Sequence, residues 1–314
     1  MRDWSVFHDG LYHHHIRHIY FTRSKHIKKI NNTIFKNKIK KLIKEHKIEI
    51  VIVGPSHYLH GHLPRDLGVP VIFDYVDFLY DFKDPNKEDT KLLSEYFNIS
   101  TKILCVSKTL MNSLPNRHKI KAEYIPNGVD LDFYKSYSFT QDKYNTKYIS
   151  LIGISISESP FYLDVFPKIK EKLNNIKMLL VGGGPRFPMI KNYIDQRKDK
   201  NDFILTGYIP YGKIRKYFYM TDVGLYPTLK NRYYDSACPL KVMEYSAASR
   251  PVVATDLEEL RKLNFPNVFL ANPTSKDYEE KIIKALNYNG PFPNLEEFTW
   301  KNIAKKLEKT LLKI

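Results

Sequence analysis

The stretch CPLKVMEYSAASRPVVAT, which spans residues 238–255, brings residues of different chemistry close together. Pro239 opens a helical pattern, Lys241 and Glu244 follow three residues apart within it, and a β-branched run ends the stretch. Residues three apart share one face of a helix, and the first turn of a helix attracts anions through its free amide groups. Lys241 could therefore hold a phosphate while Glu244 holds a hydroxyl group. The alternative is an ordinary surface ion pair that binds nothing.

Four further residues of chemical interest stand where predicted strands end, which is where open parallel sheets bind ligands. Gly153 and Gly207 follow the runs SLI and FILT, and the missing side chain lets a ligand approach the backbone. Asp74 and Asp77 lie in the run FDYVD. A continuing strand would direct them to opposite faces, whereas a turn into a helix could bring them together, so that one raises the pKa of the other and leaves a base. Asp74 could equally cap the next helix, and we favour a functional role for Asp77.

The sequence argues against several cofactors. The loop VGGGPRF at 181–187 lacks the Gly-Lys-Ser/Thr ending of a P-loop, and Phe187 stands where the dinucleotide fingerprint needs glycine or alanine. We interpret this loop as a tight turn from strand to helix. Cys105 and Cys238 have no CxxC partner for zinc. No carboxylate accompanies the histidines of the N-terminus at a recognised ligand spacing, so no metal site is predicted there; these histidines are His8, His13, His14, His15, His18 and His26.

The net charge of +16 is concentrated near the N-terminus, where residues 16–47 hold eleven Lys or Arg and one acid. Apolar residues at helical spacing predict a basic amphipathic helix over 34–47. This helix could be a solvated surface helix with its apolar stripe in the core. It could also attract an anionic membrane or a phosphate-bearing acceptor. Nucleic acid is a weaker third interpretation, because no aromatic-rich or zinc-bearing recognition module is present.

Short apolar runs alternate with helical patterns along the chain, which predicts parallel sheets covered by helices on both faces. Hydrophobic residues make up 43% of the chain and charged residues 27%, as in folded globular proteins. The polar stretch at 135–147 is typical of a linker between two α/β domains. We therefore expect an N-terminal domain over 1–140, a C-terminal domain over 141–296 and a final helix within 297–314.

Several motifs, taken in order, resemble the GT-B glycosyltransferases of the group 1 type, which make surface polysaccharides or glycolipids. These are VIFDYVD, KILCVSKTL, YIPNGVDLDFY, LLVGGGP, PLKVMEYSAASRPVVAT and FTWKNIAKKL. The resemblance covers residues 48–313, and IPNGVD together with PLKVMEYSAASRPVVAT is its most specific part. It implies an α/β fold of two Rossmann-like, doubly wound domains that face each other across a cleft. It also implies that the C-terminal helix crosses back to pack on the N-terminal, acceptor-side domain.

The resemblance also implies a donor site in the second domain. Glu244 would hydrogen-bond the ribose hydroxyls of a nucleotide-diphosphate sugar, while Lys241 and the amides near Pro239 and Leu240 would meet the diphosphate, aided by the helix dipole. Gly153, Gly207 and Tyr208 complete the expected donor site. Asp74 and Asn127 are expected on the acceptor side of the cleft. Asp77 is the candidate base if the reaction inverts the sugar, and a retaining reaction needs no separate base.

Three features depart from the family pattern. Many members carry a second glutamate eight residues before the helix glutamate, where this chain has Ser236. The Arg and Lys that often follow the first strand of the second domain are absent from LIGISISESPF at 151–161. That absence shifts charge neutralisation onto Lys241, with Arg215 or Arg232 as further cations. The chain also opens where relatives have already completed a first strand, so the first domain is expected to be one strand short or to start upstream.

We expect a metal-independent glycosyltransferase that moves a sugar from a UDP- or GDP-linked donor to a glycan, lipid-linked or protein-linked acceptor. No cofactor beyond this substrate and no nucleic acid is expected. The expected location is cytoplasmic, with peripheral contact at the inner face of the membrane. The competing interpretation is a non-catalytic nucleotide-sugar-binding subunit, which slow donor hydrolysis by the purified protein would exclude. A basic nucleic-acid binder would instead show steeply salt-dependent DNA affinity.

Overall fold

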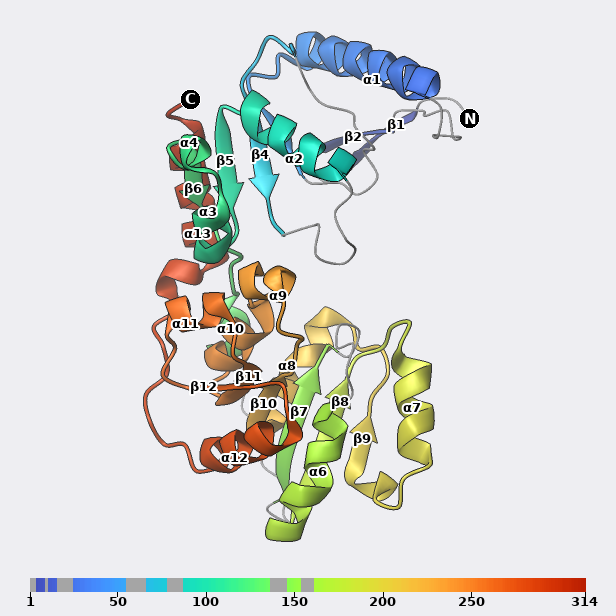
Figure 1. Ribbon diagram of the computed structural model, residues 1–314, viewed down its shortest axis with the longest axis vertical. Helices are drawn as coiled ribbons and strands as arrows, with labels where there is room; N and C mark the ends of the chain where they lie inside the picture. Colours follow the sequence, from blue (N-terminus) through green and yellow to red (C-terminus); the bar gives the residue numbers. More distant parts are fainter. Residues whose placement is uncertain are drawn as a thin grey trace. The chain divides into compact units, whose positions relative to one another are not determined.

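The computed structural model describes residues 4–8, 11–15, 25–54, 66–77, 87–135, 146–153 and 161–314 (Figure 1). The chain forms two compact units, each built on its own parallel sheet. The first unit comprises Met1–Cys105, Met111–Tyr124 and Leu312–Ile314. The second comprises Val106–Leu110 and Ile125–Leu311. Residues 106–110 and 125–135 therefore belong with the second unit although they precede its sheet in the sequence.

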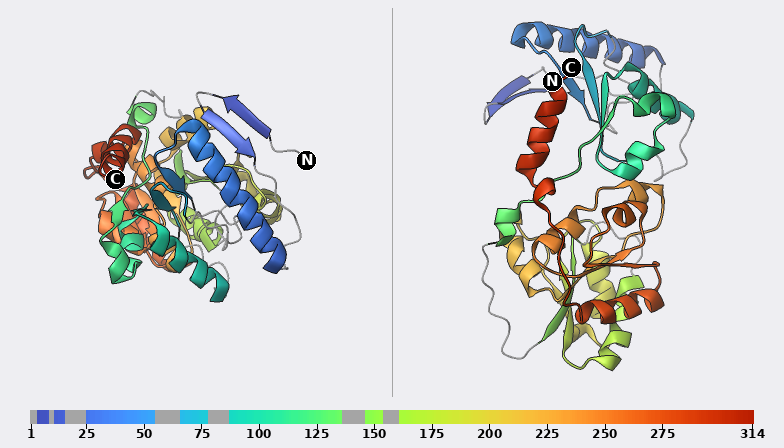
Figure 2. Two further views of the ribbon diagram at one scale, coloured as in Figure 1. Left: turned by 90° about the horizontal axis from the view of Figure 1, so that it is seen from above. Right: turned by 90° about the vertical axis from the view of Figure 1, so that its left-hand side faces the viewer.

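The first unit is built on a four-stranded sheet in which neighbouring strands are parallel, in the order β3-β4-β5-β6. Its strands are β3 (Val51–Val53), β4 (Val71–Tyr75), β5 (Lys102–Cys105) and β6 (Ala122–Tyr124). The helices are α1 (Lys25–His46), α2 (Lys87–Ile99), α3 (Lys108–Ser113), whose first residues belong to the second unit, and α4 (Asn116–Lys119). A separate antiparallel hairpin joins β1 (Trp4–His8) to β2 (Leu11–His15) (Figure 2).

The second unit is built on a six-stranded parallel sheet in the order β12-β11-β10-β7-β8-β9. The chain starts at the central strand, adds strands on one side, then returns and adds strands on the other. The order therefore reverses between β7 and β10, and open α/β sheets bind ligands outside the carboxyl ends of strands at such a point. The strands are β7 (Lys147–Ile152), β8 (Ile176–Val181), β9 (Phe203–Leu205), β10 (Val223–Tyr226), β11 (Val252–Thr255) and β12 (Val268–Ala271).

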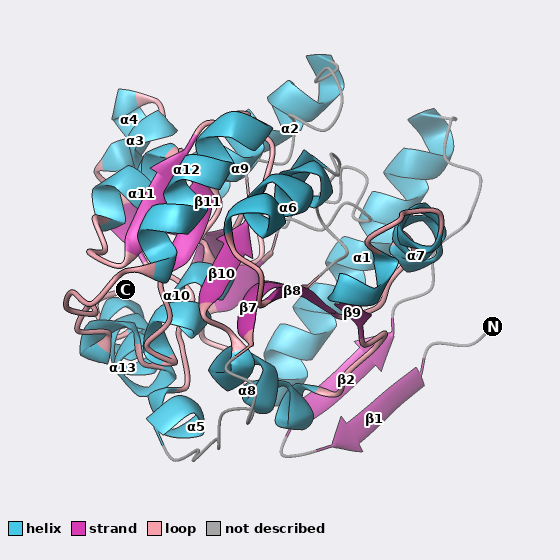
Figure 3. Cartoon of the chain, turned by 90° about the horizontal axis from the view of Figure 1, so that it is seen from below, coloured by secondary structure: helices cyan, strands magenta, loops and turns pink. Residues whose placement is uncertain are grey.

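Helices cover both faces of this sheet (Figure 3). One core cluster joins the sheet to α6 (Phe161–Lys172), α7 (Phe187–Asp195) and α12 (Ser275–Leu286). The other joins it to α5 (Leu131–Lys135), α8 (Tyr211–Met220), α10 (Leu240–Ala247) and α11 (Glu258–Leu263). The remaining helical elements are α9 (Arg232–Ser236), α13 (Trp300–Leu311) and the short turns η1 (Lys200–Asp202) and η2 (Glu296–Phe298). Because both faces are covered, the strands are continuous apolar runs, as the sequence indicates.

The predicted fold class is confirmed, since every apolar run identified as a strand forms one. The sequence pattern missed β6 and several short helices, and α1 begins nine residues before the predicted basic helix. The linker expected at 135–147 falls mostly on 136–145, outside the described residues. The expected domain limits and the packing of α13 on the N-terminal domain remain predictions. Within the described part of the chain, no helix has both the length and the apolar character needed to cross a bilayer.

Candidate functional site

The start of α10 lies at the carboxyl end of β7, beside the point where the strand order reverses. Gly153 directly follows β7 and has a φ of +96°, a conformation that favours glycine. A Cβ atom built on Gly153 would lie 3.4 Å from Cε of Lys241. The sheet and the helix therefore bring Gly153 and Lys241 into contact at the position where this fold binds ligands.

Glu244 is buried at the centre of this site, with 2% of its surface exposed. The amine of Lys241 donates to Oε2 of Glu244 at 2.8 Å. The hydroxyl of Tyr134 donates to Oε1 at 3.1 Å. Burial, followed by the charge of Glu244, raises the pKa of the Tyr134 phenol far above its ordinary value, so this hydroxyl remains a donor. Each carboxylate oxygen can accept more than one hydrogen bond, so Glu244 keeps capacity for hydroxyl groups of a ligand.

Tyr245 fixes α10 to the sheet one residue after Glu244. Its buried hydroxyl donates to the carbonyl of Ser150 at 2.9 Å and accepts from the amide of Ile152 at 3.0 Å. Both partners are on β7, whose regular pairing with β10 covers only two residue pairs. The Tyr245 ring fits because residue 224 is glycine, where a Cβ would lie 2.7 Å from the ring. Tyr245 thus sets the position of Glu244 relative to the strand ends.

The first turn of α10 presents backbone amides at the same place. Pro239 precedes the helix, and its carbonyl accepts from the amides of Val242 and Met243. The amide of Leu240 donates to the carbonyl of Cys238. The amide of Lys241 has no acceptor among the described residues. One free amide and the Lys241 amine therefore stand at the helix start, the arrangement that favours an anion.

Two of the expected donor-site residues lie at the glycine-rich loop after β8. Gly207 has a φ of +65°, and its carbonyl accepts from the amide of Gly182 at 3.2 Å. A Cβ on Gly183 would lie 2.9 Å from the backbone nitrogen of Tyr208, so this close approach requires glycine. The Tyr208 side chain is exposed. The loop is a tight turn into α7, as interpreted from the sequence, and it lies at the carboxyl edge of the sheet that also holds Gly153.

Ser236 does not replace the missing second glutamate. Its hydroxyl is buried and donates to the carbonyls of Arg232 and Tyr233 within α9. Arg215 donates from Nη1 to the carbonyl of Phe133 at 2.9 Å, and its guanidinium lies over the Phe133 ring at 5.1 Å. Of the cations considered from the sequence, Lys241 is therefore the one that the described contacts place at Glu244.

Glu259 is a second buried carboxylate, and its contacts indicate a structural role. One oxygen accepts from the amide of Lys108, and the other accepts from the amide and hydroxyl of Thr109. Lys262 in turn donates to the Thr109 hydroxyl at 2.7 Å. Glu259 therefore caps the first turn of α3 and holds residues 106–110 in the second unit. Glu259 thus accepts three hydrogen bonds from groups of the chain, whereas Glu244 accepts two.

The expected acceptor residues of the first unit lie at the carboxyl edge of its sheet. Asp74 is the fourth residue of β4, and Asp77 follows two residues after the strand ends. Burial raises the pKa of Asp74, and burial followed by the charge of Asp74 raises the pKa of the Cys105 thiol on the neighbouring strand β5 to about 12. Asp77 is partly buried. Strand β4 ends at Tyr75, and the described residues stop at Asp77, so a turn into a helix that would bring Asp74 and Asp77 together stays a prediction.

Asn127 lies in the second unit, in the loop between β6 and α5. The next residue, Gly128, packs so closely on Trp300 that a Cβ would lie 2.6 Å from the indole ring. The amide of Val129 donates to the carbonyl of Phe298 at 2.7 Å. This loop is thus fastened to the segment that starts α13, and Tyr134 follows it by seven residues.

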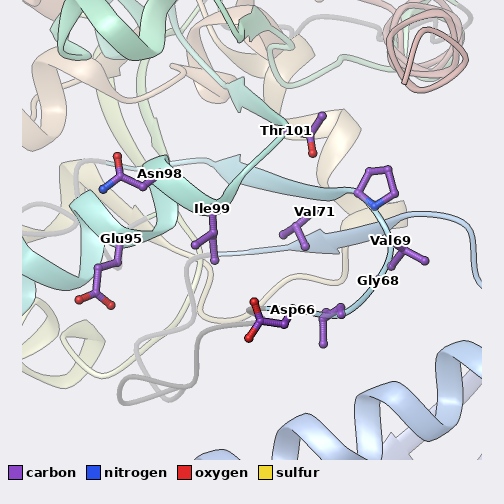
Figure 4. Close-up of a pocket in the computed structure, with 10 residues that line it drawn as sticks. Asp66, Gly68, Val69, Val71, Glu95, Asn98, Ile99 and Thr101 are labelled. Carbon is purple, nitrogen blue, oxygen red and sulfur yellow. The ribbon is translucent and has the colours of Figure 1, made fainter.

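A pocket of about 760 Å³ lies in the first unit, at the opposite edge of its sheet (Figure 4). Its walls come from the turn before β4, the end of α2 and the residue before β5, and include Asp66, Glu95 and Thr101. Parallel sheets bind substrates at the carboxyl ends of their strands. This pocket faces the amino ends of the strands, so we do not assign it a role in substrate binding. Among the side chains that the structure describes, no three His, Cys, Asp or Glu residues group closely enough for a metal; the N-terminal histidine side chains lie outside that set.

Sequence reasoning missed Tyr134 and Tyr245. Tyr134 ends the motif IPNGVDLDFY and touches Glu244 across 110 positions of sequence. The available signal was that the chain contains both IPNGVDLDFY and PLKVMEYSAASRPVVAT, but no rule of residue spacing predicts that these two motifs are in contact. Tyr245 follows Glu244 directly, and its partner Gly224 is a lone glycine inside a strand, a feature that marks close approach of another group.

Comparison with known families identifies the class. Residues 154–288 match the family model described as "Glycosyl transferases group 1", and residues 4–133 match "Glycosyltransferase Family 4". The two matches cover both units. The chain belongs to these glycosyltransferases, which have the GT-B fold.

Similar proteins agree with this assignment. Sucrose-phosphate synthase from Thermosynechococcus elongatus superimposes with a TM-score of 0.73 at 14% identity, over 98% of this chain and 85% of that one. Anabaena HepE, solved in complex with UDP, gives a TM-score of 0.71 at 13% identity, over 94% and 85%. A curated relative from Bacillus subtilis, the putative teichuronic acid biosynthesis glycosyltransferase TuaH, is 28% identical over 109 residues. That match spans 34% of this chain and about a quarter of the relative (26%).

Proposed function

We propose that this chain transfers a sugar from a nucleotide-diphosphate sugar to a glycan, lipid-linked or protein-linked acceptor, without a metal ion. The observation that carries the proposal is the buried Glu244 carboxylate, paired with Lys241 beside Gly153 at the strand-order reversal. A carboxylate with spare acceptor capacity suits the ribose hydroxyls. An ammonium group beside a free helix amide suits the diphosphate.

In this mechanism the chain stabilises the leaving nucleoside diphosphate. Negative charge grows on the diphosphate as the bond between sugar and phosphate breaks, and prearranged donors lower the barrier most where that charge develops. Lys241 and the free amide at the start of α10 supply these donors. Because the Lys241 ammonium group and a helix amide do this work in place of a metal ion, we expect that a chelator leaves turnover unchanged.

The acceptor side is assigned to the first unit. Asp77, two residues after the end of β4, is the base that we propose if the reaction inverts the sugar, and a retaining reaction needs no separate base. Asp74 and Asn127 are proposed acceptor-side residues. The Bacillus subtilis relative is named for teichuronic acid biosynthesis, which supports a surface glycan as the acceptor class.

The donor nucleotide is proposed to be UDP or GDP, and UDP is the first choice because HepE was solved with it. Gly207 and Tyr208 belong to this proposal as the strand-end residues nearest the glycine-rich loop. Gly207 has a positive φ and no Cβ atom, which lets the base of a nucleotide approach the backbone at this strand end.

We further propose peripheral attachment to the inner face of the membrane through α1. Ile30 and Ile34 on this helix are 49% and 42% exposed, although they are apolar. Exposed Lys40, Lys41 and Lys44 follow on the same helix. Apolar side chains next to lysines favour an anionic lipid surface.

A second function, a non-catalytic nucleotide-sugar-binding subunit, is favoured by Ser236, whose hydroxyl is committed to α9 instead of a ligand. Two measurements on the purified chain separate the two. A thermal-shift screen of UDP- and GDP-sugars should find a donor that stabilises the fold by mass action. That donor should then be hydrolysed slowly in the absence of acceptor if the chain is an enzyme. Binding without hydrolysis or transfer to any glycan acceptor would favour the subunit, and no stabilisation by any nucleotide sugar would contradict both.

A further inference from the structure

The two partners of Glu244 differ in how firmly they are held. Tyr134 is fully buried, whereas the Lys241 side chain is 28% exposed. The amine of Lys241 ends a flexible four-carbon stem, and it is held by the ion pair with Glu244 and by a weaker contact over the Phe218 ring, 5.9 Å from the ring centroid. Lys241 therefore occupies the solvent side of the Glu244 carboxylate and Tyr134 the protein side.

The ring of Tyr134 is locked by its neighbours. It meets the rings of Phe133 and Phe218 edge to face, with centroid separations of 5.0 and 5.3 Å. A buried ring packed on two sides cannot change rotamer without opening the core. The Tyr134 hydroxyl is therefore a fixed donor at Oε1 of Glu244.

A diphosphate would exchange only one of these two partners. It carries more negative charge than Glu244, and the Lys241 stem is long enough to turn from one anion to the other. When the amine leaves Oε2, a carboxylate held by nothing else could rotate. Tyr134 prevents this rotation because its bond to Oε1 does not involve the solvent side.

On the basis of the proposed donor site, we propose that Tyr134 is a positioning residue that holds Oε1 of Glu244, so that Oε2, once released by Lys241, accepts from the ribose diol of a ribonucleotide donor. Tyr134 does not touch the donor. It acts through Glu244 and gives the site its preference for ribose over a sugar without the two hydroxyl groups. Tyr134 belongs to the motif IPNGVDLDFY and Glu244 to the motif PLKVMEYSAASRPVVAT. The preference for ribose therefore depends on both motifs.

The experiment compares UDP with 2′,3′-dideoxy-UDP in calorimetric titrations of three proteins: the parent, Tyr134→Phe and Tyr278→Phe. Tyr278 is the matched control, because its equally buried hydroxyl bonds to Thr255 and Tyr226 and has no contact with Glu244. We expect the parent to bind UDP at least 10-fold more tightly than the dideoxy compound, as one hydrogen bond to a charged group contributes. Tyr134→Phe should weaken UDP binding about 10-fold and leave the dideoxy affinity unchanged within about twofold. Tyr278→Phe should keep the parent ratio.

The outcomes distinguish this inference from the proposed function. A parent that prefers UDP, combined with a Tyr134→Phe protein that keeps the full preference, would overturn the positioning role and leave the donor site intact. A parent that binds both compounds equally would overturn the role of Glu244 itself. GDP and its dideoxy form replace the uridine pair if the parent binds GDP alone, and a parent that binds neither nucleotide overturns both proposals. If Tyr134→Phe does not fold, Phe133→Leu, which removes a ring that packs edge to face on Tyr134, should reduce the ratio by a smaller factor, and an unchanged ratio would count against the inference.

Discussion

The amine of Lys241 and Oε2 of Glu244 lie 2.8 Å apart, so the proposed phosphate cation and the proposed ribose acceptor neutralise each other before a donor arrives. Donor binding would replace this ion pair by an ion pair between Lys241 and the diphosphate and by hydrogen bonds that the ribose hydroxyls donate to Glu244. The buried carboxylate is thus never left without a partner, which would be costly. An isolated helix pair at the surface contributes only about 0.2–0.5 kcal/mol, and the burial of Glu244 sets this pair apart.

Glu244→Gln should weaken donor binding by about 1–3 kcal/mol, because a neutral amide is a poorer partner for hydroxyl groups than a carboxylate of the same shape. Calorimetry with the donor found in the screen measures this loss. Glu280→Gln is the matched control, since Glu280 pairs with Lys284 on an exposed helix face. Equal donor affinity in the parent and in a folded Glu244→Gln protein would remove Glu244 from the site.

Gly224→Ala should lower the free energy of unfolding by about 1–3 kcal/mol, the usual cost of overpacking a core. The added methyl group would meet the Tyr245 ring at 2.7 Å. Urea unfolding measures the change, and donor affinity should fall with it because Tyr245 positions α10. Gly212→Ala is the control, since nothing lies within 4 Å of the added atom. Equal stability of the two variants would show that Tyr245 is not wedged against β10.

The sequence was sufficient for those parts of the fold and site that depend on local pattern. Lys241 and Glu244 were found because three-residue spacing on a helix is a local signal, and the strands were found because buried parallel strands are continuous apolar runs. Strand β6, with the sequence AEY, was missed because it is short and partly polar. Helix α12 carried a usable signal in its Thr274 cap, whose hydroxyl accepts from the amide of Asp277.

Contacts between distant segments could not be predicted in the same way. The bond from Tyr134 to Glu244 spans 110 residues, and the cap that Glu259 gives to α3 spans about 150. Both depend on which helix ends the sheet brings together. Residue type gives no sign that Glu259 is buried, because its burial depends on two amides and a hydroxyl supplied by a remote segment.

Asp74→Asn should raise stability at pH 7. Burial raises the folded-state pKa of Asp74, so the folded chain binds the proton more tightly than the unfolded chain, and the contribution of this carboxyl to stability is lost as pH rises through the folded pKa. The neutral amide avoids the cost of a buried charge at pH 7. Urea unfolding of the parent and of the variant should be measured at pH 7 and below about pH 4. The gain in the free energy of unfolding should appear at pH 7 and be much smaller at the lower pH, where the unfolded carboxyl is also protonated. A less stable Asn variant at pH 7 would contradict the burial argument.

Reversing three charges of α1 should weaken binding to anionic vesicles. Lysines near anionic lipid contribute about 1 kcal/mol each, so the combined change of Lys40, Lys41 and Lys44 to Glu should lower the partition coefficient at least ~10-fold. Co-sedimentation with phosphatidylserine-containing vesicles measures this. The same change of Lys301, Lys305 and Lys309 on α13 keeps the net charge equal and serves as the control. Equal losses in both triple variants would point to net charge instead of α1.

The most direct measurement of the central claim is turnover by Lys241→Met. The variant keeps most of the side-chain stem and removes the charge, and loss of one transition-state donor usually lowers kcat about 10²-fold or more. Lys276→Met, at an exposed position of α12, is the control and should keep parent turnover. With donor hydrolysis as the assay, we predict a loss of about 100-fold in kcat for Lys241→Met, with the fold intact by circular dichroism. Turnover within a few-fold of the parent would mean that another cation meets the diphosphate, and it would contradict the site assigned to the start of α10.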